Sequence, residues 1–210
     1  SDFILTVVGR SQKRANGPVP RLWDGELSLD EFCRVLDEEF AALGHRLSTA
    51  EVLLEMARQM HERPTVMNAV AQLRKHGIAT AALSNRWLSD QQVDEEDEVR
   101  RRAFDVYLLS CEAKLHKPDN KFLRMACEQL GVEPASVVYL DEIGANLKPA
   151  AKMGMTTIRV SDPDDALAEL ETITGITLRN LPAGQEQDPG QGAAQAQEPG
   201  QDLERGSQDA

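Results

Sequence analysis

The chain has 210 residues, of which 41% are hydrophobic and 28% are charged, and its net charge is −12. This composition is typical of a soluble globular protein. The acidic balance argues against unaided binding to nucleic acid or to anionic membranes, because both require a basic surface. The sequence also contains no apolar run near the roughly 20 residues that a membrane span needs.

The cysteines and the two ends of the sequence bear on the cellular compartment. The three cysteines, Cys33, Cys111 and Cys127, are dispersed and form no Cys-x-x-Cys pair, which favours a reduced, intracellular protein. The chain begins at Ser1 without a basic-then-apolar secretory signal. Its last residues, 207–210, are not a peroxisomal Ser-Lys-Leu address. We therefore expect a cytoplasmic protein.

The first regular element begins after an N-terminal segment, residues 1–27, that we expect to be irregular. Ser28 and Glu31 have the spacing of a capping box, which predicts a helix start. Gly44 is a natural residue to follow the end of that helix. One face of the helix is apolar, and it contains Leu29, Phe32, Cys33, Leu36 and Phe40.

Two more helices follow. Ser48 and Glu51 repeat the capping spacing, and Pro64 suits the first turn of a third helix. We assign residues 28–64 to a helical unit and residues 65–180 to a separate core.

The core alternates helices with short apolar strands. A helix stops at a glycine three times, at Gly77, Gly131 and Gly154, and an apolar segment follows each time. Another such segment begins "VYLL". Helices that alternate with wholly apolar strands are typical of a parallel sheet covered on both faces. The predicted fold class is therefore α/β, with a doubly wound parallel sheet.

The last 30 residues, 181–210, differ from the rest. They contain no aromatic residue and are rich in Gln, Pro and Gly. Such a segment cannot bury enough apolar surface to offset the entropy lost on ordering. We expect this tail to be disordered.

Polar side chains gather where the predicted strands end. Ser84 and Asn85 follow one strand, Asp141 and Glu142 follow another, and Lys117 follows the strand between them. Functional groups in such sheets collect beyond the carboxyl ends of the strands. Carboxylates without a neighbouring His or Cys suit Mg²⁺, and the lysine, hydroxyl and amide suit a phosphate. The set predicts a phosphate-and-magnesium site.

Each part of this set also has an ordinary structural interpretation. Ser84 and Asn85 alone would fit a turn with a helix cap. Asp141 and Glu142 alone would fit the acidic first turn of a helix. The order of the three groups along the chain favours the site over these separate explanations.

The stretches "AALSN", "KPD" and "VVYLDEIGANLKPA" resemble motifs two, three and four of the haloacid dehalogenase (HAD) superfamily. The similarity is greatest to the N-terminal phosphatase domain of bifunctional soluble epoxide hydrolases, and acyl-CoA dehydrogenases with an N-terminal HAD domain come second. It spans roughly Leu22 to Pro182, and the stretch around Asp141 is its most specific part.

The resemblance implies a HAD-like, Rossmann-like doubly wound sheet with residues 28–64 as a helical cap. It also implies a Mg²⁺-dependent phosphatase acting on a small organic or lipid phosphate monoester. In such enzymes an aspartate on the first strand is the nucleophile. Ser84, Asn85 and Lys117 would bind the phosphoryl group, Lys117 and Asp141 would act in catalysis, and Asp141 and Glu142 would hold the metal.

The sequence departs from this pattern in its first motif. No Asp-x-Asp occurs before Ser84, and Asp24 lies in a polar segment rather than on a strand. We therefore expect the first strand to be missing and this chain to be inactive, because the covalent route needs the nucleophile. A truncated or alternative product is favoured over a true pseudoenzyme. "FILTVV", residues 3–8, would fill the strand's place in part, but it carries no acid.

A second departure is Glu142, where relatives usually have aspartate. Its extra methylene fits the strict octahedral geometry of Mg²⁺ less easily, so the sequence leaves open whether Glu142 supports the metal. The alternative function is a non-catalytic interaction or dimerisation module, including a homodimer, built on the same fold.

Overall fold

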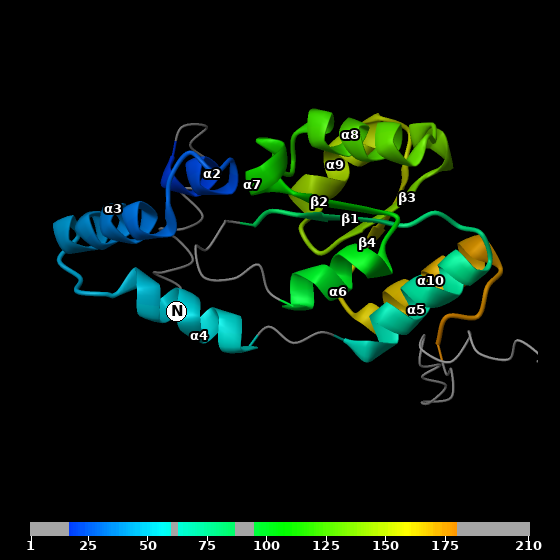
Figure 1. Ribbon diagram of the computed structural model, residues 1–210, viewed down its shortest axis with the longest axis horizontal. Coiled ribbons are helices and arrows are strands. Elements are labelled where there is room, and N and C mark those ends of the chain that lie inside the picture. Colours follow the sequence, from blue (N-terminus) through cyan, green and yellow to red (C-terminus); the bar gives the residue numbers. More distant parts are fainter. Residues whose placement is uncertain (1–16, 60–62, 87–94, 180–210) are drawn as a thin grey trace, which may run out of the picture.

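The computed structural model describes residues 17–59, 63–86 and 95–179 (Figure 1). The expectations for residues 3–8 and for the tail, 181–210, lie outside the described residues. Within the described ranges, no helix is both long enough and apolar enough to cross a bilayer.

Short helices and four-residue strands alternate through the core. The first helices are α2 (Pro18–Trp23), α3 (Leu29–Ala42), α4 (Thr49–Gln59) and α5 (Pro64–Lys75). The strands are β1 (Ala81–Ser84), β2 (Val106–Leu109), β3 (Val138–Asp141) and β4 (Thr156–Arg159). The remaining helices are α6 (Glu95–Ala103), α7 (Ser110–Ala113), α8 (Asn120–Leu130), the 3-10 helix η1 (Pro134–Ser136), α9 (Gly144–Lys152) and α10 (Pro163–Thr174).

The strands form two parallel pairs. Ala81 of β1 is in register with Val106 of β2, and Val138 of β3 is in register with Thr156 of β4. In the part of the chain that the structure describes, β1 and β3 each have one strand partner, and the two pairs are separate sheets. The parallel α/β class is confirmed, although each strand is shorter than its apolar segment.

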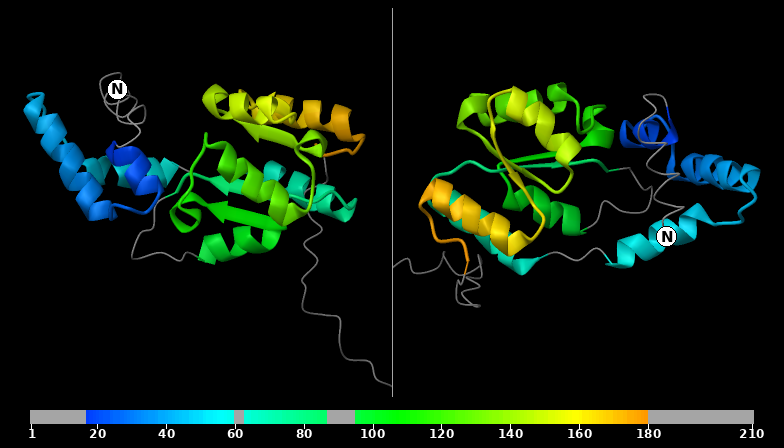
Figure 2. Two further views of the ribbon diagram at one scale, coloured as in Figure 1. Left: turned by 90° about the horizontal axis from the view of Figure 1, so that it is seen from above. Right: turned by 180° about the vertical axis from the view of Figure 1, so that it is seen from behind.

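Helices cover both faces of the strands, with α8 and α9 on one side and α5, α6 and α10 on the other (Figure 1 and Figure 2). Alternate residues of a strand point to opposite faces. Accordingly, Val138 and Leu140 pack towards α5 and α10, whereas Tyr139 packs towards α8 and α9. Leu83 of β1 joins the same cluster as Tyr139, so the two strand pairs share one hydrophobic layer.

The helices before the core form their own small core. The capping box of Ser28 and Glu31 is confirmed, with the Glu31 amide donating to the Ser28 hydroxyl at 3.2 Å. The expectation that residues 1–27 are irregular is corrected for Pro18–Trp23, which form α2. Proline at the helix start and burial of apolar side chains explain α2. The buried residues of this small core are Val19, Leu22, Phe32, Leu36 and Phe40.

Helix α2 is fastened to the core beside α7. Asp24 Oδ1 lies 2.7 Å from Nδ1 of His116, and the His116 ring lies 5.6 Å from the ring of Trp23. Lys114 Nζ also donates to the carbonyl of Gly25 at 3.5 Å. Because α7 directly follows β2, these contacts place α2 at the carboxyl edge of the strands.

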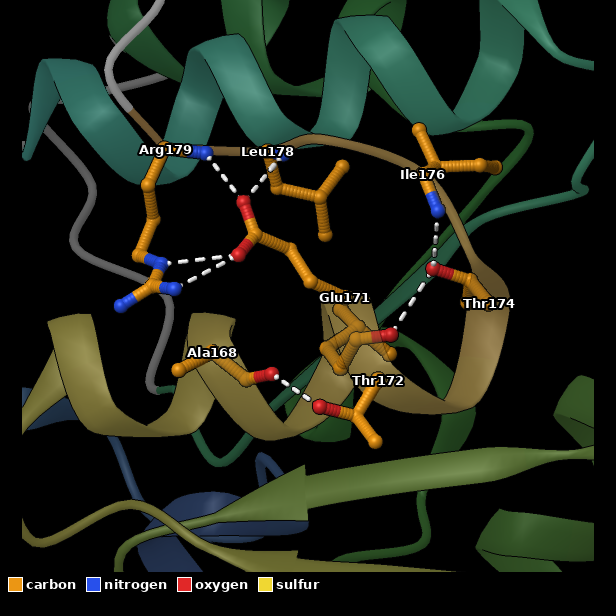
Figure 3. Close-up of polar contacts among 8 residues, drawn as sticks. Ala168, Glu171, Thr172, Thr174, Ile176, Leu178 and Arg179 are labelled. Carbon is orange, nitrogen blue, oxygen red and sulfur yellow. Dashed lines mark hydrogen bonds and ion pairs between the residues drawn. The ribbon is translucent and has the colours of Figure 1, made fainter.

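The segment after α10 is held by one carboxylate (Figure 3). Glu171 accepts the backbone amides of Leu178 and Arg179 at 2.6 and 2.8 Å, and the Arg179 guanidinium at 2.7 and 2.9 Å. Leu178, which is 1% exposed, is thereby inserted into the cluster that α5 and α10 share. The Arg179 side chain and these amides lower the pKa of Glu171 to about 2.

Candidate active site

The expected site residues lie at the carboxyl edge of the strands. Ser84 is the last residue of β1 and is half-buried, while Asp141 is the last residue of β3. Lys117 lies in the loop between α7 and α8, and its peptide bond to Pro118 is cis. Segments far apart in the sequence therefore meet at this edge.

Lys117 and Asp141 form a buried ion pair. Lys117 Nζ donates to Asp141 Oδ2 at 2.9 Å, and the two side chains are 16% and 1% exposed. An ammonium has three N–H donors, and this pair uses one of them. The ammonium can therefore also bind an anion at the edge of the site.

Asp141 receives four hydrogen bonds. At Oδ2, Tyr139 Oη donates at 2.9 Å beside Lys117. At Oδ1, the Ile143 amide donates at 2.8 Å and Asn146 Nδ2 donates at 2.9 Å. A carboxylate offers about four acceptor positions, so the chain itself satisfies this buried group in full.

These contacts shift the pKa values of both partners on β3. Burial opposes the charge of Asp141, but the hydrogen bonds from Lys117 and from the Ile143 amide outweigh it and lower the pKa of Asp141. Burial and the Asp141 charge raise the pKa of Tyr139 well above its ordinary value. At neutral pH, Asp141 is therefore an anion and Tyr139 is a hydrogen-bond donor.

Asn85 fixes the backbone of Lys117. Its Nδ2 donates to the Lys117 carbonyl at 2.9 Å, and its Oδ1 accepts the Lys117 amide at 2.7 Å. This two-point contact joins the end of β1 to the loop that carries the ammonium. A side-chain amide has two N–H groups, so one remains for a ligand.

Glu142 differs from the other site residues because it is exposed. It follows Asp141 directly, so the two carboxylates share the turn into α9. The structure thus brings Ser84, Asn85, Lys117 and Asp141 to one edge and leaves Glu142 at its solvent side.

The carboxylates of the site are of the kind that bind Mg²⁺. Mg²⁺ prefers oxygen ligands and is usually held by one or two carboxylates together with substrate phosphates and waters, which matches Asp141 and Glu142. Among the residues with described side chains, no cluster of three or more His, Cys, Asp or Glu side chains forms a fuller metal site. A cation that binds Asp141 must displace one of its four donors.

Three contacts near the site were not expected from the sequence. Tyr139 lies two residues before Asp141, and strand alternation could have placed both on one face. Asn146 lies in the first turn of α9, directly after the Asp141 strand, so its position at the helix start could have indicated it. The contact of Asp24 with His116 joins residues 92 positions apart, and no local pattern indicates it.

Comparison with protein families identifies the domain. The model of haloacid dehalogenase-like hydrolases matches residues 9–154. Bifunctional epoxide hydrolase 2 of Rattus norvegicus is 32% identical over 196 residues, which cover 86% of this chain and 34% of the rat protein. Acyl-CoA dehydrogenase family member 10 of Mus musculus is also 32% identical and covers 78% of this chain, but only 15% of the mouse protein is matched. The chain thus spans about a third or less of the length of these relatives.

Solved structures show the same fold. A predicted HAD-like family hydrolase of Porphyromonas gingivalis matches with a TM-score of 0.59 at 17% identity, covering 79% of this chain and 82% of that chain. A HAD family enzyme of Bacteroides thetaiotaomicron, crystallised with magnesium and inorganic phosphate, matches with a TM-score of 0.52 at 18% identity. That match covers 74% of this chain and 79% of the other.

Proposed function

This chain belongs to the haloacid dehalogenase-like hydrolases, and on that premise we propose that its site binds Mg²⁺ and the phosphoryl group of an organic or lipid phosphate monoester. The observation that carries the proposal is the buried pair of Lys117 and Asp141 at the carboxyl edge of the strands. The Bacteroides enzyme of the same fold, which was crystallised with magnesium and inorganic phosphate, supports this proposal.

The residues of the site divide the work of binding. Lys117 pairs with the phosphoryl oxygens through the N–H groups that Asp141 does not use. Asn85 keeps the Lys117 backbone in place, and its remaining N–H and the Ser84 hydroxyl donate to the same phosphoryl group. Such donors act strongly because they are held in position before the ligand arrives.

Asp141 and Glu142 are the residues that would hold the cation. When bound, Mg²⁺ neutralises charge on the phosphoryl oxygens. Asp141 also keeps Lys117 oriented, because Oδ2 of Asp141 accepts a hydrogen bond from Lys117 Nζ.

We propose that this chain binds its ligands without turning them over. No Asp-x-Asp occurs before Ser84, and within the described strands Asp141 is the one acidic residue. That carboxylate is 1% exposed and accepts four hydrogen bonds, so it is a poor nucleophile. We expect ligand binding to persist, because the residues proposed to bind the ligands are not the aspartate nucleophile of such enzymes.

One observation favours the alternative, a non-catalytic interaction module. Asp141 is satisfied by Lys117, Tyr139, Ile143 and Asn146, so the fold needs no ligand to compensate a buried charge. In this alternative the same pair serves only to hold β3 and the Lys117 loop together.

Two assays on the full chain distinguish these functions. The thermal unfolding midpoint is measured with Mg²⁺, with inorganic phosphate, and with both. The proposal predicts a larger rise with both together, because ligands that bind only the folded state stabilise it. An unfolding midpoint that rises in none of these conditions would favour the interaction module. The second assay measures phosphate release from an aryl phosphate with Mg²⁺, and sustained turnover would refute the absence of a nucleophile.

A further inference from the structure

Tyr139 has a polar contact that its place in the hydrophobic layer does not require. It packs against the hydrophobic cluster on the side of α8 and α9, which contains Leu123, Cys127 and Ala150. Its hydroxyl reaches Oδ2 of Asp141 at 2.9 Å. A phenylalanine would fill the same apolar space, so the hydroxyl acts on the carboxylate rather than on the packing.

The two oxygens of Asp141 have different surroundings. Oδ1 accepts hydrogen bonds from the Ile143 amide and from Asn146, a residue that is 5% exposed. Oδ2 is held by Tyr139 and by Lys117, whose side chain is 16% exposed. Because Lys117 is also the group proposed to bind the phosphoryl oxygens, Oδ2 is the oxygen nearer the proposed ligand site, and a cation bound with the phosphate would meet it there.

A cation must displace a donor from Oδ2, and the two donors are not equivalent. Lys117 is drawn towards a phosphoryl group when one binds, and its long stem allows that movement. Tyr139 projects from β3 and reaches Asp141 from the same strand, two residues away. A bound phosphate therefore leaves its hydroxyl on Oδ2, and a cation must displace it.

We propose that the Tyr139 hydroxyl competes with a divalent cation for Oδ2 of Asp141 and so weakens the binding of Mg²⁺ at this site. Tyr139 is then a positioning residue that acts through Asp141 and sets the cation affinity. The inference rests on the proposed function, because it takes Asp141 as a metal ligand.

The test is a titration of the full chain with Mg²⁺ by isothermal calorimetry, comparing wild type with Tyr139→Phe. We expect the variant to bind Mg²⁺ about tenfold more tightly, because an open acceptor position replaces a hydrogen bond to a charged group, and tenfold corresponds to about 1.4 kcal/mol. The same titration with inorganic phosphate present should retain the difference, since phosphate does not draw the Tyr139 hydroxyl away from Oδ2.

Tyr107→Phe is the matched control. Tyr107 is a half-buried tyrosine on β2, and its ring contacts Phe104 and the Arg101 guanidinium rather than Asp141. The control should leave the Mg²⁺ dissociation constant unchanged. Circular dichroism and the unfolding midpoint of both variants report whether the fold is intact, and Tyr139→Leu provides a second variant without the hydroxyl.

The outcomes separate the two proposals. Equal or weaker Mg²⁺ binding by Tyr139→Phe and Tyr139→Leu, with binding by wild type, would overturn the competition and leave the proposed function standing. Tighter binding by these variants but not by Tyr107→Phe supports the competition. Absence of Mg²⁺ binding by every variant would overturn the metal site itself.

Discussion

Removing the ammonium of Lys117 measures the cost of leaving the buried charge of Asp141 without its ion partner. Lys117→Met keeps an apolar stem but leaves the charge of Asp141, whose side chain is 1% exposed, without its ion partner. Breaking a buried pair by removing one partner costs about 3–5 kcal/mol. Asp141 keeps the hydrogen bonds from Tyr139, Ile143 and Asn146, so we expect the lower end, about 3 kcal/mol.

Urea denaturation at pH 7 measures this change in the free energy of unfolding. In a thermal melt of a domain of about 150–250 residues, a loss of about 3 kcal/mol lowers the thermal unfolding midpoint by roughly 6–12 °C. Lys148→Met, a change at an exposed lysine of α9, is the control and should stay within about 0.5 kcal/mol. A loss below about 0.5 kcal/mol for Lys117→Met would refute the assignment of this pair as a buried, energetically important contact.

A double variant tests whether the effect is electrostatic. Asp141→Asn removes the charge that Lys117→Met leaves uncompensated. The double variant should therefore be more stable than the sum of the two single losses predicts, by at least about 1 kcal/mol. Simple additivity would indicate that the two side chains act independently.

Three further changes have specific expected outcomes. Asn85→Ala removes both contacts to the Lys117 backbone, so phosphate binding measured by calorimetry should weaken about tenfold; unchanged affinity would argue against its positioning role. Glu171 has a pKa of about 2 against an ordinary 4.5, so its contribution is complete above about pH 4.5 and is lost as the pH falls towards 2. The stability gap between wild type and Glu171→Gln should therefore narrow over that interval, and a gap independent of pH would contradict the ion pair. His116→Ala removes the contact to α2, so amide exchange in Pro18–Trp23 should become faster, whereas exchange at the wild-type rate would show that other contacts hold this helix.

Local sequence patterns predicted those parts of the fold that depend on local chemistry. The capping box at Ser28 fixes a helix start because both partners lie within one turn. Gly131 ends α8 with φ of 68°, a backbone conformation that glycine adopts without strain. The parallel pairing followed from apolar strands that alternate with helices. Helix α2 was missed because Val19 and Leu22 become buried only against α3, a contact between elements.

The candidate site was predictable in its members but not in its bonds. The end of an apolar strand predicted that Asp141 lies at the carboxyl edge. The loop that follows the "VYLL" strand predicted that Lys117 lies near it. Strand alternation and the start of α9 could have placed Tyr139 and Asn146 near Asp141, but the sequence could not show that both side chains donate to its carboxylate, because these bonds depend on side-chain conformations that no sequence pattern specifies. Nor did it show that Asn85 holds the Lys117 backbone rather than only facing a ligand.

A crystal structure of this chain with Mn²⁺, which reports its position by anomalous scattering, and inorganic phosphate tests the central claim most directly. We expect Mn²⁺ against an oxygen of Asp141, a phosphate oxygen within hydrogen-bonding distance of Lys117 Nζ, and the Tyr139 hydroxyl displaced from Oδ2 by the cation. Mn²⁺ bound elsewhere, with Asp141 retaining all four of its present donors, would contradict it.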